Sequence, residues 1–327
     1  MTTMSACTIV FHVDDLLITC QDEGVMIDSL GVALKENFAA ITVSRGNKNS
    51  YLAMNLVVSE NGIALDMVAY VKKCLEGKVI KRGVKSPAGE NLFEVPEQGV
   101  PLTTEEKKLF HSDVAKLLYL AKRSRGQILT AVSHLSGRVK EPTQDDLVKL
   151  NRVFSYLGNT EDQVLQFKSG GIVEPEVYID ASYGVHSDGT SRTGMVIMMG
   201  GAAIGMWSSK QKLVTKSSTE AEIVALSDGL TNALWIREMV LTQGYKLGPT
   251  KVFEDNQGVI KIIQSGRSPK HRTRHLNVRH FFAKDRERSG DIQMVYKPTE
   301  MMIADIMTKP VSGALFDKLG SELVGAT

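Results

Sequence analysis

The sequence predicts a mixed α/β (α+β) fold in which helices cover a mixed sheet in the C-terminal part of the chain. Short apolar runs typical of strands occupy residues 8–66 and 177–208, whereas apolar residues at helical spacing occupy residues 103–157. Beyond residue 217 helical and strand patterns alternate, which is typical of a sheet with helices on its faces. At roughly 100–200 residues per domain, the 327 residues indicate more than one domain.

The composition is that of an ordinary globular protein. Hydrophobic residues make up 43% of the chain, which excludes extensive disorder, and 39 Lys+Arg against 37 Asp+Glu leave a net charge of only +2. Three cysteines without a Cys-x-x-Cys pair exclude a disulfide framework and this kind of zinc site. No apolar stretch reaches the ~20 residues of a membrane span, and no secretory signal is visible. We therefore expect an intracellular protein, cytoplasmic or nuclear, without a membrane partner.

The first hundred residues are predicted to be rich in strands. The expected strands cover residues 8–13, 16–19, 50–58 and 63–66. The last two are predicted to form a hairpin, because Asn61-Gly62 is among the stronger turn signals. Residues 25–34 have helical spacing, and the prolines and glycines of residues 87–101 indicate a loop.

A helical region follows this loop. Thr103 and Glu106 form a capping-box pattern at its start. The expected helices cover residues 103–121, 128–139 and 144–157. Gly158 and Asn159 are good terminators for the last of them.

The pattern changes near residues 168–172, where we expect a domain boundary. The strands expected beyond it are residues 177–181, 195–199, 202–208, 211–215, 251–254 and 292–296. Helices are expected from Ser217, over residues 257–263, in the basic stretch that follows, and near residues 299–308.

Acidic residues interrupt these apolar elements. Asp180 and Asp255 end two strands, while Glu222 and Asp305 lie on helices. A single aspartate at a strand end is more often a turn former or a cap than a ligand, so only the combination indicates chemistry. Carboxylates that converge from different elements repel one another unless cations neutralise them, and Mg²⁺ prefers such oxygen ligands. Two ions about 4 Å apart can promote phosphodiester cleavage.

The carboxylates lie in short motifs that resemble a known family. The motifs are Tyr178-Ile-Asp-Ala-Ser182, Ser217-Ser-Thr-Glu-Ala-Glu222, Glu254-Asp-Asn-Gln257, Lys297-Pro-Thr-Glu300 and Ala304-Asp-Ile-Met-Thr-Lys309. Together with the basic segment at residues 270–279, they resemble the ribonuclease H domain of copia-type LTR retrotransposons.

This resemblance implies a ribonuclease H-like, mixed five-stranded sheet with flanking helices. It implies that two Mg²⁺ ions, or alternatively Mn²⁺, are held by Asp180, Glu222, Asp255 and Asp305, and that the substrate is an RNA–DNA hybrid. Glu222 is favoured over Glu220 because Glu222-Ile-Val-Ala225 fits the family's Glu-x-x-Ala step. Glu220 is also expected to cap its helix together with Ser217.

The pair Asp14-Asp15 joins two apolar strands without a glycine to ease the turn. The segment His12-Val13-Asp14-Asp15 resembles the Tyr-Val-Asp-Asp signature of reverse transcriptases, with His12 in place of tyrosine. The resemblance implies that Asp14 and Asp15 are metal ligands in a complete enzyme. Further matches at residues 51–54, 110–120, 131–136 and 152–157 extend the resemblance over nearly the whole chain, although Gly126-Gln127 departs from the family's usual Pro-Asp.

The resemblance divides the chain into four parts. They are a partial reverse-transcriptase palm (residues 1–100), a helical thumb or connection (101–168), a ribonuclease H-like domain (172–312) and a C-terminal tail (313–327). Only 13 residues precede Asp14, too few for the strand that supplies the third palm carboxylate. We therefore expect no DNA polymerisation by this chain alone, and we expect the missing N-terminal part of a polyprotein, or a second copy, as its partner.

A basic stretch indicates a contact with nucleic acid. Between residues 261 and 288, nine basic and two acidic residues give a local net charge of +7. Such a run is often a solvated helix face, but beside a carboxylate cluster it suits a phosphate backbone. The expected contact residues are Lys270, Arg272, Arg274, His275 and Arg279. The alternative hypothesis is a decayed or co-opted fragment that binds nucleic acid or a protein without catalysis.

Overall fold

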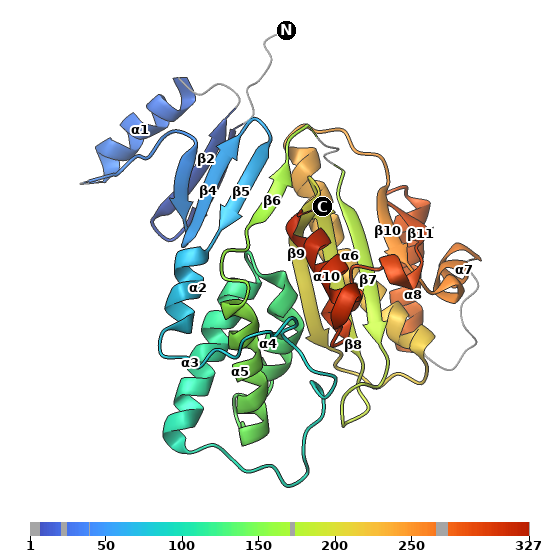
Figure 1. Cartoon of the computed structure of the whole chain (residues 1–327). Coiled ribbons are helices and arrows are strands. Elements are labelled where there is room, and N and C mark those ends of the chain that lie inside the picture. The colour runs from blue at the N-terminus through green and yellow to red at the C-terminus, as the bar shows by residue number, and fades with distance from the viewer. Residues whose placement is uncertain (1–6, 21–24, 39, 171–173, 266–273, 327) are drawn as a thin grey trace.

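The computed structural model describes residues 7–20, 25–38, 40–170, 174–265 and 274–326 (Figure 1). A strand-rich part, a group of helices and a five-stranded sheet follow one another along the chain. No helix among the described residues is long and apolar enough to cross a membrane.

The strand-rich part contains a hairpin, a helix and most of an antiparallel sheet. Its elements are β1 (Cys7–His12), β2 (Asp15–Cys20), α1 (Val25–Asn37), β3 (Lys48–Tyr51), β4 (Met54–Ser59) and β5 (Gly62–Asp66). Strands β1 and β2 form a two-stranded sheet, and the second sheet has the order β3-β4-β5-β6. The predicted hairpin near Asn61-Gly62 is confirmed, because β4 pairs with β5 from Ser59 and Gly62 onward.

Two features of this sheet differ from the prediction. The strand expected at residues 50–58 is split by a turn at Leu52 and Ala53, whose φ angles of 50° and 61° are unusual for such residues. Residues 165–168, predicted in the helical region, form β6 (Leu165–Lys168) and pair with β5. A Cβ on Gly62 would lie 1.8 Å from the Phe167 carbonyl oxygen, so glycine permits this pairing.

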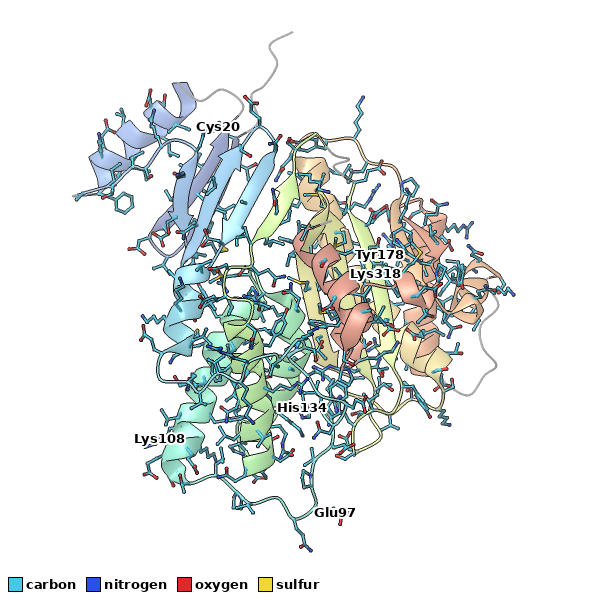
Figure 2. All side chains as sticks on the ribbon, viewed as in Figure 1. Cys20, Glu97, Lys108, His134, Tyr178 and Lys318 are labelled. Carbon is cyan, nitrogen blue, oxygen red and sulfur yellow. The ribbon has the colours of Figure 1, made fainter. Side chains whose placement is uncertain are left out.

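The helical group consists of α2 (Val68–Leu75), α3 (Thr104–Ala121), the 3-10 turn η1 (Gly126–Ile128), α4 (Leu129–Ser136) and α5 (Gln144–Gly158). The predicted capping box of α3 is confirmed: the Glu106 amide donates to Thr103 Oγ1 at 3.3 Å, and Glu106 Oε2 accepts from the Thr103 amide at 2.9 Å. At η1 the helices meet the sheet so closely that a Cβ on Gly126 would lie 1.9 Å from Met206 Sδ. His134 of α4 is buried (Figure 2).

The C-terminal part is built on the five-stranded sheet. Its elements are β7 (Glu176–Ser182), β8 (Arg192–Met199), β9 (Ala202–Lys210), α6 (Ser218–Thr242), β10 (Thr250–Glu254), α7 (Gln257–Ser265), α8 (Arg274–Arg288), β11 (Ile292–Tyr296), η2 (Thr299–Met301), α9 (Asp305–Thr308) and α10 (Gly313–Val324). The strand order is β11-β10-β7-β8-β9, with β7, β8 and β9 antiparallel and β7, β10 and β11 parallel. The predicted mixed five-stranded sheet with flanking helices is therefore confirmed.

Two apolar cores hold the sheet in place. On one face, α6, α7 and α8 pack against residues such as Val177, Ile179 and Val252. On the other face, α9 and α10 join the helical group in a second core that includes Val196 and Met307. The sheet is thus buried on both sides, and the ends of its strands remain to carry polar groups.

Three local predictions for this part differ from the structure. Residues 211–215 form no strand, because the Gln211 side chain turns inward and donates to the Ala221 carbonyl at 2.9 Å. Residues 299–308 are not one helix but η2 and α9. Residues 313–327, predicted as a tail, contain α10, which buries Phe316 and Leu319 against the second core. The division into four domains stays a prediction.

Candidate metal centre

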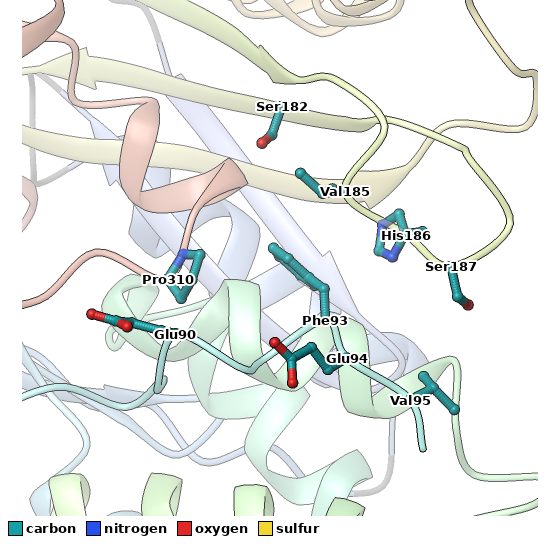
Figure 3. Close-up of a pocket in the computed structure, with 9 residues that line it drawn as sticks. All are labelled: Glu90, Phe93, Glu94, Val95, Ser182, Val185, His186, Ser187 and Pro310. Carbon is teal, nitrogen blue, oxygen red and sulfur yellow. The ribbon is translucent and has the colours of Figure 1, made fainter. Parts of the chain in front are cut away.

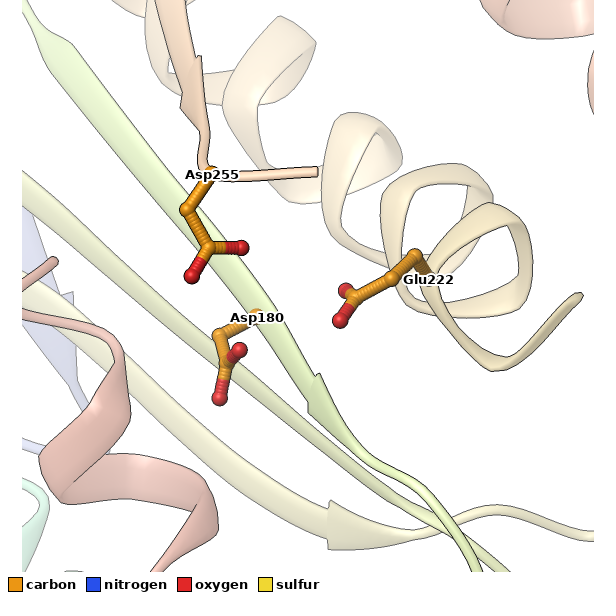
Figure 4. Close-up of side chains that lie close together, drawn as sticks. All are labelled: Asp180, Glu222 and Asp255. Carbon is orange, nitrogen blue, oxygen red and sulfur yellow. The ribbon is translucent and has the colours of Figure 1, made fainter. Parts of the chain in front are cut away.

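Three carboxylates converge at one edge of the five-stranded sheet. Asp180 lies near the end of β7, Asp255 directly follows β10, and Glu222 lies in the first turns of α6. Because β7 and β10 are parallel neighbours, their ends meet at the same edge. One carboxylate oxygen from each residue lies within 4.8 Å of the other two, and Figure 4 shows the three side chains facing one another. We call these residues the carboxylate triad.

Two members of the triad are buried, the third is half-buried, and no basic side chain in the described part of the chain forms an ion pair with Glu222 or Asp255. Asp180 and Glu222 are only 2% and 5% exposed, and Glu222 Oε2 has no hydrogen-bond partner. Burial, followed by the charges of Glu254, Asp180 and Asp255, raises the pKa of Glu222 well above its usual value. Isolated buried carboxylates of this kind are costly unless they are protonated or bind a cation.

Glu254, the residue before Asp255, adds a further buried carboxyl group next to the triad. It is completely buried, its Oε1 accepts from the Asn256 amide at 3.0 Å, and its Oε2 has no partner. Burial raises the pKa of Glu254 to about 8. The prediction of the site did not include Glu254, although its position at the end of an apolar strand was a usable signal.

Asp305 lies beside the triad rather than within it. The Nζ atom of Lys309 is 2.7 Å from Asp305 Oδ1 and 3.5 Å from Asp180 Oδ2. Burial, followed by the charge of Asp180, raises the pKa of Asp305 to about 7, although Lys309 opposes this shift. Burial by itself would lower the pKa of Lys309, but the charges of Asp180 and Asp305 outweigh it and raise that pKa to about 12.

Two threonines orient the aspartates. The hydroxyl of Thr308 donates to Asp180, and the hydroxyl of Thr299 donates to Asp255 Oδ2 at 2.6 Å. Hard oxygen donors, mutual repulsion and an unpartnered buried oxygen on Glu222 together fit a divalent cation such as Mg²⁺ or Mn²⁺.

The structure distinguishes Glu222 from Glu220. The Glu220 amide donates to Ser217 Oγ at 3.2 Å, and the Glu220 carboxylate accepts from the Lys216 amide at 2.8 Å. Glu220 thus caps the start of α6. Its carboxylate accepts from the amide of Lys216, whereas in a capping box it would accept from the amide of the N-cap residue, Ser217. Glu222 lies on the turn that faces the sheet and joins the triad. Its role as a metal ligand stays a prediction.

Asp14 and Asp15 lie elsewhere, on the β1–β2 hairpin. Both are exposed. Among the described residues, the carboxylates that lie close enough together to hold a metal ion do not include either of them. The turn between the two strands, which has no glycine, is formed by Val13 and Asp14. The φ angle of Val13 is 56°, which is unusual for a β-branched residue. The metal-binding role of this pair also stays a prediction.

The structure describes the predicted basic residues only in part. Lys270 and Arg272 lie outside the described residues, and Arg274 and His275 are described only as backbone positions of α8. The guanidinium of Arg279 forms an ion pair with Asp228 of α6 and donates to the Val224 carbonyl at 3.4 Å. Arg279 therefore joins α8 to α6, whatever else it contacts.

A cavity of about 540 Å³ is lined by residues that include Ser182, Pro310 and Phe93 (Figure 3). Phe93 lies edge-on to the rings of His134 and His186, at 5.5 and 5.1 Å between ring centroids. Burial lowers the pKa of His134 to about 3 and that of His186 to about 4, so both rings are neutral at pH 7. Because Glu90 and Glu94 also line it, this cavity does not favour a phosphate.

No protein-family model matches the chain. The chain is 27% identical over 319 residues to the retrovirus-related Pol polyprotein from transposon RE1 of Arabidopsis thaliana, covering 95% of the chain and 21% of that protein. It is 25% identical over 349 residues to the transposon Ty1-ER2 Gag-Pol polyprotein of Saccharomyces cerevisiae, covering 98% and 19% respectively. The chain thus spans about a fifth of the length of these relatives.

Among solved structures, ribonuclease H1 LC11, isolated from compost, covers 42% of the chain and 94% of its own, at 19% identity and a TM-score of 0.34. LC11 in complex with an RNA/DNA hybrid has 17% identity and a TM-score of 0.31, covering 41% of the chain and 94% of its own. The sequence comparisons confirm the predicted resemblance: the homologues of this chain are retrovirus-related Pol polyproteins of copia-type transposons.

Proposed function

We propose that the chain is the reverse transcriptase/ribonuclease H portion of a retrotransposon polyprotein, and that it hydrolyses the RNA strand of RNA–DNA hybrids with two divalent cations. The observation that carries this proposal is the carboxylate triad, which the ends of two parallel strands and the start of α6 bring together. Its converging charges and the unpartnered Glu222 oxygen support a bound cation.

In this proposal the residues divide the work. Asp180, Glu222 and Asp255 would hold one ion, and Asp180 with Asp305 would hold the second. Divalent ions bound in this way supply activation of water and stabilisation of the leaving oxygen. Thr308 and Thr299 keep Asp180 and Asp255 oriented through their hydroxyls.

The substrate would be bound through its charged phosphates and not through recognition of its base sequence. Basic side chains of residues 270–279 would contact the phosphate backbone, which fixes the position of the duplex without reading its bases. The predicted contacts at Lys270, Arg272, Arg274 and His275 have this role in the proposal. Arg279 would contribute mainly by fastening α8 to α6.

Cleavage of a labelled hybrid tests the proposal. We expect the RNA strand of an RNA–DNA hybrid to be cut in Mg²⁺ and left intact in EDTA, with RNA–RNA and DNA–DNA duplexes uncut. Asp255→Asn should abolish cutting, whereas Asp188→Asn, which changes an exposed aspartate of the same domain, should not. A folded chain that binds the hybrid without cutting it would favour the alternative of a non-catalytic binding module.

We also propose that Asp14 and Asp15 serve DNA synthesis only within a longer enzyme or an assembly of copies. Their exposure on a two-stranded hairpin, beside the exposed apolar side chains of Phe11 and Val13, supports this. We expect no primer extension by the 327-residue chain with Mg²⁺ and deoxynucleotides. Robust incorporation by the chain alone would contradict this part of the proposal.

A further inference from the structure

The carboxylates at the sheet edge form two halves that share Asp180. In one half, Asp180 faces Glu222 and Asp255, and in the described part of the chain no basic side chain forms an ion pair with Glu222 or Asp255. In the other half, Asp180 lies beside Asp305, and the Lys309 ammonium lies between them. The two halves therefore differ in charge before any cation binds.

Lys309 is well placed to act as a cation on a tether. It directly follows α9, so its backbone is fixed one residue beyond Thr308, which itself donates to Asp180. Its ammonium reaches Asp305 Oδ1 at 2.7 Å and Asp180 Oδ2 at 3.5 Å, although these carboxylates are only 6% and 2% exposed. The Lys309 side chain is 38% exposed, so its flexible stem has a path to solvent.

We propose that Lys309 is a tethered counter-cation that occupies the place of the second divalent ion until that ion displaces it. The inference rests on the proposed two-ion function and adds an order to it. A first ion binds to the carboxylate triad, and a second ion binds to Asp180 and Asp305 only as the Lys309 ammonium withdraws. Lys309 is thus a positioning residue: without the second ion, it holds Asp305 against Asp180.

Electrostatics favours this order. An ammonium and a divalent ion that share two carboxylate ligands repel each other strongly at a separation of a few ångströms in a buried site. The triad half offers three carboxylates, of which only Asp180 is paired with Lys309, whereas both carboxylates of the second half are, so the triad half is the stronger site. The second half gains a divalent ion only by breaking an existing charge-assisted hydrogen bond from Lys309 to Asp305 and the ion pair of Lys309 with Asp180.

Manganese titration of the metal-free full chain tests the inference, with bound Mn²⁺ counted by electron paramagnetic resonance. We expect one tight and one weaker ion in the unaltered chain. Lys309→Gln should tighten the second ion by at least about tenfold and leave the first nearly unchanged, because it removes the competing charge. Lys309→Met, which keeps the apolar stem, should do the same, while Lys309→Arg should resemble the unaltered chain.

Controls separate this inference from the proposed function. Lys210→Gln removes the same charge from another lysine–aspartate pair, with Asp188, and should not change either ion. Two equally tight ions in the unaltered chain, or an unchanged second ion in both Lys309→Gln and Lys309→Met, would overturn the inference alone. Absence of any Mn²⁺ binding that depends on Asp255 would overturn the proposed function instead.

Discussion

The β1–β2 hairpin and the five-stranded sheet both place aspartates at the ends of apolar strands, but they treat them differently. Asp14 and Asp15 are neighbours in the chain and remain exposed on two strands. Asp180 and Asp255 are 75 positions apart, and parallel strands bring them to one edge, where α6 adds Glu222. A carboxylate pair becomes a candidate metal centre only when distant elements enclose it and force its charges together.

The largest expected difference in hybrid cleavage is between variants of two glutamates of α6. Glu222→Gln should lower hybrid cleavage more than about a hundredfold, since even the outer partners of metal ligands cost ten- to hundredfold. Glu220→Gln should retain cleavage and lose only about 0.3–1 kcal/mol of unfolding free energy, because it weakens a helix cap. Initial rates and denaturant unfolding measure both effects. Loss of cleavage only in Glu220→Gln would reverse the assignment.

Substitution of glycine by alanine should have opposite effects on stability in the five-stranded sheet and in α1, the helix that follows the β1–β2 hairpin. A Cβ on Gly194 of β8 would lie 2.5 Å from Thr308 Cγ2 and 2.8 Å from Met307 Cβ, so Gly194→Ala should cost about 1–3 kcal/mol and displace α9. Gly31 of α1 has nothing within 4 Å, so Gly31→Ala should stabilise that helix by about 0.5–1 kcal/mol. Urea unfolding compares them, and equal signs would refute the packing argument.

The buried carboxyls predict an unusual pH dependence of the metal-free chain. The pKa of Glu254 is raised from 4.5 to about 8, so the folded chain binds more protons than the unfolded chain up to that pH. Between about pH 6.5 and 8, unfolding free energy should therefore fall as pH rises, by roughly 1 kcal/mol per pH unit. Below this window the buried neutral histidines act in the opposite direction, because their lowered pKa values favour folding as pH rises.

Thermal unfolding in EDTA across this window measures the slope. Glu254→Gln should make it shallower and raise stability at pH 8, and added Mg²⁺ should restore stability to the unaltered chain. A midpoint that rises steadily from pH 6.5 to 8 would contradict the burial of these acids.

The smallest expected effect on stability and on hybrid binding is that of replacing Arg279 of α8. Arg279→Gln should cost at most about 1 kcal/mol of stability, because its pair with Asp228 is partly exposed. It should barely change the salt dependence of hybrid binding. Replacing Arg272 and Arg274 together should flatten that dependence, because each phosphate contact contributes to the slope. The reverse pattern would identify Arg279 as the phosphate contact.

Local signals made much of the fold predictable. The strand at residues 292–296 has the bounds expected from its apolar run, and the capping box at Thr103 is present. Turns and pairings without local signals could not be predicted. Leu52 and Ala53 adopt left-handed backbone without glycine, and β6 is defined only by pairing with β5, about 100 positions away.

The candidate site shows the same division. Asp180 and Asp255 were predictable because each is a charge at the end of an apolar strand. The burial of Asp180 and Glu254 and the position of Lys309 between Asp180 and Asp305 depend on contacts between segments far apart in the chain. No spacing rule indicates which lysine will neutralise which aspartate.

The central claim is that hydrolysis belongs to the carboxylate triad and not to the hairpin. The most direct measurement is the rate of Mg²⁺-dependent cleavage of an RNA–DNA hybrid by three chains: unaltered, Asp255→Asn, and the double variant Asp14→Asn/Asp15→Asn. We expect cleavage by the unaltered chain and the double variant at equal rates, and none by Asp255→Asn. Full cleavage by Asp255→Asn, or its loss in the double variant, would contradict the account.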